Sequence, residues 1–230
     1  IKMINFIKKF LFIKINKLHE VYKTINNSVI FDIGAHKGDK SKKLINYFSK
    51  IILVEPQPEC VIALKSKFSK YKNVTIIETG LSSKEQKLEL KINTSNPLIS
   101  TFSDKWTTGR FKDSKWDQRL DISTTTLDRL VSQFGSPDYI KIDVEGHEYD
   151  VIKGLSKKVG TISFEFTSEF FEESLKCLNY LQSLGYEKFN FSEGEKRKFN
   201  SDWLKKDNLI SHLEIELKKN SLLWGDIYAQ

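Results

Sequence analysis

Cysteine is scarce in this sequence, and long apolar runs are missing from it. The 230 residues include two cysteines, Cys60 and Cys177, which stand far apart and match no metal-binding or redox spacing. We therefore expect free, buried thiols and a reducing compartment. No run of about 18 apolar residues is present, so no transmembrane helix is expected. No small-residue cleavage site follows an apolar segment, which argues against a signal peptide and predicts a cytoplasmic protein.

No internal repeat or low-complexity linker divides the chain. The net charge of +7 comes from a lysine-rich composition, and the basic residues are too few and too scattered to favour nucleic-acid binding. A chain of this length can bury one sizeable core. We expect one α/β domain over residues 26–230, preceded by a separate segment over residues 1–25.

Residues 1–25 carry an amphipathic, basic pattern. Apolar residues recur there at helical spacing on one face, and lysines stand largely elsewhere. A helix packed on its own domain, a dimer contact and a basic helix on a membrane surface are all compatible with this pattern. The membrane interpretation, which Phe6, Phe10 and Phe12 support by widening the apolar face, would place the protein peripherally at the inner face of the membrane.

From residue 29 onward, predicted strands and helices alternate. This order is typical of a parallel sheet with helices on both faces. Helices are expected up to Asn46 and over residues 58–68, 149–155 and 172–184. The expected strands are Val29–Ile33, Ile51–Val54, Val74–Glu78, Tyr139–Ile142, Thr161–Phe166 and a closing pair, Tyr186–Phe191 and Leu222–Tyr228.

The stretch over residues 93–120 interrupts this alternation and is predicted to be a long loop. It interleaves Trp106, Phe111 and Trp116 with basic residues such as Arg110. Loops of this length in compact domains are usually functional or disordered. Aromatic faces stack on sugar rings and cations meet anionic groups of a glycan, so Trp106, Arg110 and Trp116 are the predicted substrate-binding residues. The alternative is that the aromatic side chains pack down onto the sheet.

A nucleotide-binding pattern begins at the first strand. That strand contains Asp32, turns at Gly34 and leads into a helix, and Glu55 ends the next apolar run about 20 residues later, where an acid binds ribose hydroxyls. Glycine at position 34 permits a sharp turn and close approach of a ligand. His36 replaces the second glycine of the dinucleotide pattern, where a side chain would block a pyrophosphate. A nucleoside without a pyrophosphate is therefore favoured over NAD.

A third motif, Lys-Ile-Asp-Val-Glu-Gly at residues 141–146, extends this pattern. Together with Asp32-Ile33-Gly34-Ala35, Val54-Glu55-Pro56 and Thr126-Leu127-Asp128, it resembles the FkbM family of S-adenosylmethionine-dependent methyltransferases. The sequence departs from the family at His36 and Asp39, where an amide and an aromatic residue are common. The resemblance implies a Rossmann-like class I methyltransferase fold of the α/β class. Such a fold has a mostly parallel seven-stranded sheet, helices on both faces and an antiparallel last strand.

The resemblance also implies that S-adenosylmethionine binds beyond the carboxyl ends of the strands, as ligands do in open α/β sheets. Gly34 and its neighbours would contact the methionine part, Glu55 the ribose, and residues 80–82 the adenine. Asp143 would lie where the sulfonium meets the acceptor. The predicted cofactor-binding residues are Asp32, Ile33, Gly34, Ala35, His36, Gly38, Glu55, Pro56, Gly80, Leu81, Ser82 and Asp143.

The reaction implied by the resemblance is O-methylation, in which a base removes the proton of the acceptor hydroxyl. We predict Asp143, Glu145 and His147 as catalytic residues, with His36 and Glu165 as further candidate bases. His147 could instead be a histidine at the start of a helix. A divalent metal held by Asp143 and Glu145 is an alternative way to acidify the hydroxyl. Their spacing is not diagnostic, so no metal is predicted.

The acceptor is expected to be a sugar hydroxyl of a glycan or glycolipid, with a small natural product as the alternative. Two other classes stay open. An NAD(P)-dependent oxidoreductase is disfavoured by His36 and by the lack of a suitably placed Tyr-x-x-x-Lys pair. A catalytically silent binding module is disfavoured by the intact Asp32, Gly34, Glu55 and Asp143. The oligomeric state is left open.

Overall fold

The computed structural model describes residues 21, 28–109, 111–196 and 198–230. The helix expected over residues 1–25 therefore lies outside the described residues, apart from Val21, which packs in the core. Arg110 lies outside them as well. Within the described part of the chain, no helix has the length and apolar character needed to cross a membrane. Cys60 and Cys177 are buried and free, as expected.

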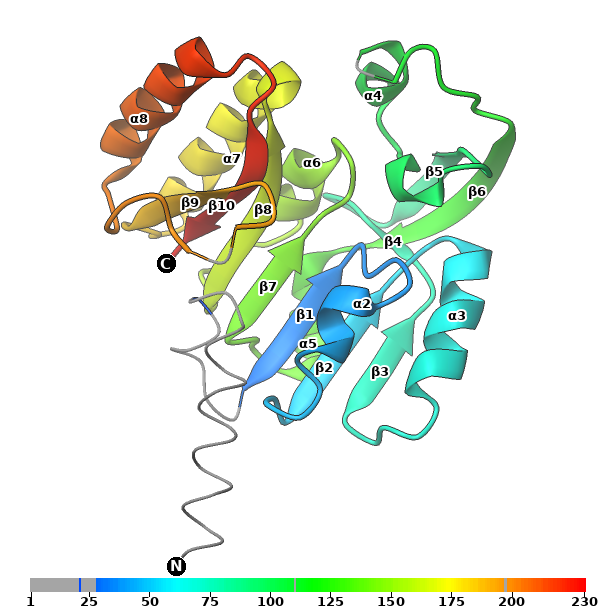
Figure 1. Ribbon diagram of the computed structural model, residues 1–230. Helices are drawn as coiled ribbons and strands as arrows, with labels where there is room; N and C mark the ends of the chain where they lie inside the picture. The colour runs from blue at the N-terminus through cyan, green and yellow to red at the C-terminus, as the bar shows by residue number, and fades with distance from the viewer. Residues whose placement is uncertain (1–20, 22–27, 110, 197) are drawn as a thin grey trace, which may run out of the picture.

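A seven-stranded sheet forms the centre of the molecule (Figure 1). Its strands in chain order are β1 (Val29–Ile33), β2 (Lys50–Val54), β3 (Val74–Ile77), β7 (Tyr139–Ile142), β8 (Thr161–Thr167), β9 (Phe189–Glu193) and β10 (Trp224–Ala229). In space they follow the order β3-β2-β1-β7-β8-β10-β9, and β10 runs antiparallel to both of its neighbours. This arrangement confirms the mostly parallel sheet with an antiparallel last strand.

Helices cover both faces of this sheet. Because successive side chains of a strand point to opposite faces, β1 contributes to two cores: Phe31 and Ile33 to one, and Ile30 to the other. Burial on both faces explains why β1 and β2 read as continuous apolar runs. The helices of the first core are α5 (Leu127–Phe134), α6 (Glu148–Lys153), α7 (Phe171–Ser183) and α8 (Lys206–Lys219), and the second core includes α3 (Pro58–Phe68) and the segment after α2 (Asp39–Lys42).

A smaller three-stranded sheet lies beyond the carboxyl ends of the central strands (Figure 1). It consists of β4 (Gly80–Leu81), β5 (Gln86–Ile92) and β6 (Gln118–Thr125), and the segment between β5 and β6 contains the short helices η2 (Pro97–Ile99) and α4 (Asp104–Thr108). The antiparallel pair aligns Leu88 with Ile122 and Leu90 with Leu120, so apolar side chains alternate with polar ones. The stretch predicted as one long loop therefore connects β5 to β6, the two strands of a hairpin, and its last residues belong to β6.

Candidate active site

A cleft opens where β1, β2 and β7 end, which is the point where the strand order reverses and where ligands bind in open α/β sheets. It contains about 640 Å³ of space, including the part open to solvent. Four predicted cofactor-binding residues, Asp32, Ala35, Gly38 and Ser82, do not line it. Those that do are Ile33, Gly34, His36, Glu55, Pro56, Gly80, Leu81 and Asp143.

Gly34 forms the floor of the cleft and is held between two strand ends. Its backbone has a φ of 78°, and an added Cβ would lie 1.8 Å from the carbonyl oxygen of Asp143. The N–H groups of Gly34 and Ala35 donate to the carbonyl oxygen of Val54 at 3.0 and 3.1 Å. Only glycine fits this position, because any side chain would clash with the end of β7 and strain the backbone.

Glu55 is fixed in the wall of the cleft by backbone groups. Glu55 is only 2% exposed. Its carboxylate oxygens accept hydrogen bonds from the N–H groups of His36 (2.8 Å) and Gln57 (2.9 Å). Burial raises the pKa of Glu55 to about 7, although the two N–H donors oppose this shift. A carboxylate has further acceptor sites for the hydroxyls of a ligand.

An ion-pair network joins Asp143, which lines the cleft, to buried Lys141 and to the exposed Lys40. The Nζ atom of Lys141 is 2.9 Å from Asp143 Oδ2 and 3.7 Å from Asp32 Oδ1, and Lys40 Nζ is 3.4 Å from Asp143 Oδ2. Ser41 donates to the other oxygen of Asp32 at 2.5 Å. Burial alone would raise the pKa of Asp143, but Lys141 and Lys40 outweigh it and lower that pKa to about 2. Asp143 is therefore held as an anion at the edge of the cleft.

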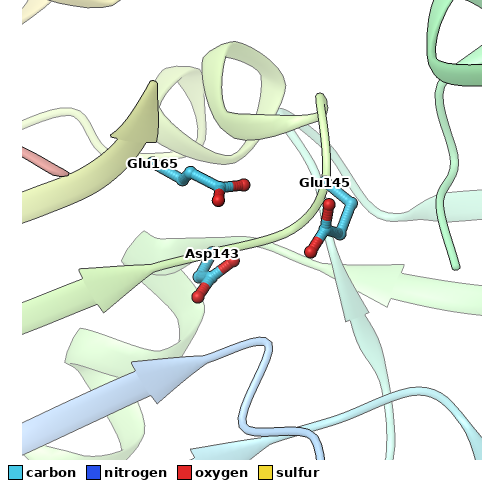
Figure 2. Close-up of side chains that lie close together, drawn as sticks. All are labelled: Asp143, Glu145 and Glu165. Carbon is cyan, nitrogen blue, oxygen red and sulfur yellow. The ribbon is translucent and has the colours of Figure 1, made fainter. Parts of the chain in front are cut away.

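Three carboxylates converge beside this network. Asp143 follows β7, Glu145 lies two residues further along the loop, and Glu165 projects from β8 (Figure 2). One oxygen of each lies within 4.8 Å of the others. Hard divalent cations accept such ligands. However, two ammonium groups already neutralise Asp143, so the cluster by itself does not identify a metal site.

His147 does not line the cleft. Its Nε2 atom is 3.3 Å from Ser82 Oγ, and its ring centroid is 5.4 Å from that of Phe102, which does line the cleft. Burial is the main reason why the pKa of His147 is lowered. Its role as a base stays a prediction.

The predicted substrate-binding tryptophans also lie outside the cleft. Trp106 is 4% exposed and packs between Phe111 and Phe170, with ring centroids 5.1 and 5.2 Å away. Its indole Nε1 is buried and has no hydrogen-bond partner among the described residues. Trp116 is half-buried and donates to the carbonyl oxygen of Phe111 at 3.3 Å. Their substrate role, like that of Arg110, stays a prediction.

Residues 97–102 form a wall of the cleft that the sequence does not predict. Gln57 Nε2 donates to the carbonyl oxygen of Pro97 at 3.2 Å, and Thr101 Oγ1 donates to the carbonyl oxygen of Glu145 at 2.6 Å. These bonds bring Leu98, Ser100 and Phe102 to the cleft. Ser100 is 8% exposed, and its hydroxyl has no hydrogen-bond partner among the residues that the structure describes. The interruption of the strand–helix alternation marks this segment, but no motif in it signals a cofactor contact.

Residues 32–188 match the methyltransferase FkbM domain. The hexuronic acid methyltransferase AglP of Haloferax volcanii is 23% identical over 141 residues, which are 60% of this chain and 54% of that protein. The crystal structure of methyltransferase FkbM from Methylobacillus flagellatus KT superposes with a TM-score of 0.54 at 15% identity, covering 89% of this chain and 44% of that one. The chain thus spans about half the length of each of these two proteins.

The family match and the observed fold agree. At this low identity the solved structure shows the fold alone, and that fold is the Rossmann-like class I methyltransferase fold expected from the sequence. The matched domain begins at Asp32 and includes Gly34, Glu55 and Asp143. Because it covers more than half of the residues, the chain belongs to the FkbM family of methyltransferases.

Proposed function

We infer that this protein is an S-adenosylmethionine-dependent O-methyltransferase that acts on a hydroxyl group of a sugar in a glycan or glycolipid. One observation carries the cofactor part of this inference: a buried carboxylate, Glu55, is held by two backbone N–H groups in the wall of a cleft whose floor is a glycine turn. The turn leaves no room for a Cβ, and the carboxylate suits a vicinal diol such as that of a ribose.

The donors and acceptors of the cleft fit this cofactor. Glu55 would accept from the ribose hydroxyls, and the apolar side chains of Leu81, Leu98 and Phe102 would contact the adenine ring. Asp143, held as an anion by Lys141 and Lys40, would lie near the positive sulfonium. When bound, the cofactor supplies a methyl group on a good leaving group, so the chain's main task is to align the acceptor oxygen.

The sugar acceptor is supported by the similarity to a hexuronic acid methyltransferase. Membership of a methyltransferase family argues against the oxidoreductase alternative. An assay of methyl transfer distinguishes a catalytically silent member of the family from an active one.

The test is an assay with a panel of sugars. The purified protein is incubated with S-adenosylmethionine and with methyl glycosides of neutral sugars and hexuronic acids, and S-adenosylhomocysteine and methylated sugar are measured by mass spectrometry. We expect the two products to form together in equal amounts. Cofactor binding without methylation of any sugar would contradict the proposed acceptor class, and no cofactor binding would contradict the whole proposal.

A further inference from the structure

Acidic side chains form a row across the ends of β7, β8 and β10. Asp226 stands opposite Glu165 in the register of β10 with β8. The pairing of Ile142 with Phe164, continued by one residue, places Asp143 on the other side of Glu165. Phe164 and Phe166 are buried in the core, whereas Glu165 between them is half-buried.

Glu165 and Asp143 differ in their charged partners. Asp143 contacts two ammonium groups, whereas Glu165 has no hydrogen bond or ion pair from its carboxylate to any described residue. Glu165 also lies one strand further from β1 and β2 than Asp143 does. It does not line the cleft assigned to the cofactor. Its carboxylate is thus free to meet a group that arrives from the side opposite the nucleoside.

A second polar group without a partner belongs to a residue that lines a small cavity beside Glu165. Trp106, Gly146 and Phe170 line this cavity together with Glu165. The Nε1–H of Trp106 is buried and has no acceptor in the part of the chain that the structure describes. A hydroxyl group both donates and accepts hydrogen bonds, so it can satisfy an indole N–H and a carboxylate at once. A hydroxyl at this point would contact Glu165, and Glu145, which lines the cleft, has a carboxylate oxygen within 4.8 Å of one of Glu165.

We propose that Glu165 is the general base that takes the proton of the acceptor hydroxyl, an assignment that rests on the proposed function. The acceptor oxygen attacks the methyl carbon as its O–H bond breaks, and the proton passes to the carboxylate of Glu165. The electron pair of the breaking carbon–sulfur bond stays on sulfur, which leaves as neutral S-adenosylhomocysteine. Glu165 then returns the proton to solvent.

The electrostatic surroundings of Glu165 support this role. Burial and then the neighbouring carboxylates raise the pKa of Glu165 well above its ordinary value. A carboxylate with a raised pKa is a stronger base, and it acts only when ionised, so methyl transfer should increase as pH rises through that pKa. The charged groups facing Glu165 are Asp143 after β7, Glu145 in the next loop, Glu148 of α6, Asp226 of β10 and, across the small cavity, Glu173 of α7.

The experiment compares four variants of the full chain: Glu165→Gln, Glu165→Asp, Glu145→Gln and, as the matched control, Glu214→Gln, which alters an exposed carboxylate of α8. Single-turnover methyl transfer to the best sugar of the panel is measured from pH 5.5 to 9, and S-adenosylmethionine affinity is measured by calorimetry. We expect Glu165→Gln to lose about 100- to 10,000-fold in rate, the usual contribution of a general base. It should keep cofactor affinity and lose the pH dependence. Glu165→Asp should restore part of the rate, and Glu214→Gln should stay within a few-fold of the parent.

Several results would overturn the assignment. These are a Glu165→Gln variant that transfers methyl at the parent rate, one that loses cofactor affinity in the same proportion as rate, and a pH dependence removed by Glu145→Gln instead. A methyl ester product, released by mild alkali, would also overturn it, because a carboxylate acceptor has no proton to remove. These failures differ from a failure of the proposed function. If the parent protein binds the cofactor but methylates no sugar, the proposed acceptor class is wrong. If the parent is active and Glu165→Gln is equally active, only the assignment of Glu165 is wrong.

Discussion

The carbonyl oxygen of Asp143 occupies the place where a side chain at Gly34 would begin, 1.8 Å from the position of an added Cβ. This contact joins the first and third sequence motifs. It sets the separation between the ends of β1 and β7 and so the shape of the cleft floor. Two residues more than one hundred positions apart in the sequence therefore depend on each other directly.

Gly34→Ala should destabilise the protein more than an alanine at a strained but open glycine. Gly135 is the matched control, because it also has a positive φ, 91°, but nothing lies within 4 Å of an added Cβ. Backbone strain should cost each variant about 1–3 kcal/mol of unfolding free energy, and Gly34→Ala should lose more because of the clash. Denaturant unfolding measures both. Equal losses would mean that β7 moves aside freely.

Ser100→Ala should weaken S-adenosylmethionine binding without harming the fold. The Ser100 hydroxyl is buried in the cleft wall and no described residue is its partner, so its hydrogen bond is expected to form with the ligand. Its loss should reduce binding by about 0.5–1.5 kcal/mol. Ser103→Ala, which alters a nearby serine outside the cleft lining, is the control. Unchanged affinity in Ser100→Ala would remove residue 100 from the cofactor site.

Cofactor affinity should increase as pH rises through about 7. Burial raises the pKa of Glu55 to about 7, so the carboxyl group is largely protonated below that pH and ionised above it. Ribose hydroxyls donate more strongly to the ionised form. Calorimetry from pH 5.5 to 8.5 should show this rise in the parent and a flatter profile in Glu55→Gln. The same rise in Glu55→Gln would assign the pH dependence to another group.

Methyl transfer should survive removal of divalent metal ions. Lys141 and Lys40 already neutralise Asp143, the central member of the carboxylate cluster, so the alignment of the acceptor does not depend on a cation. Assays after treatment with EDTA check this. Activity that disappears with the chelator and returns with magnesium would contradict the prediction and assign a metal to the three carboxylates.

The sequence predicts the central sheet well because its strands are buried on both faces. β1 and β7 have the predicted bounds, since short apolar runs ending at acids and glycines are unambiguous there. β5 is not predicted, because one of its faces is exposed and its apolar residues, Leu88 and Leu90, alternate with charged ones. Helix α8 is missed because only Leu209 and Leu213 are buried in a largely polar stretch.

The candidate site is predictable where one motif carries both position and chemistry. Gly34 and Glu55 line the cleft as their motifs predict. The approach of Glu165 to Asp143 depends on the pairing of β8 with β7, two strands that a helix separates in the sequence. The return of residues 97–102 to the cleft depends on individual hydrogen bonds, such as that from Gln57 to Pro97. These contacts cannot be predicted from the spacing of residues in the sequence.

The central claim is that this cleft binds S-adenosylmethionine with its ribose on Glu55, and calorimetric titration of the parent protein, Glu55→Ala and Glu59→Ala tests it most directly. Glu59 is exposed at the start of α3. Glu59→Ala removes the same charge as Glu55→Ala, so it controls for long-range electrostatics. We predict binding to the parent and to Glu59→Ala with similar affinity, and a loss of about 1.5–3 kcal/mol in Glu55→Ala. Equal affinity of all three proteins, or no binding to the parent, would contradict the account.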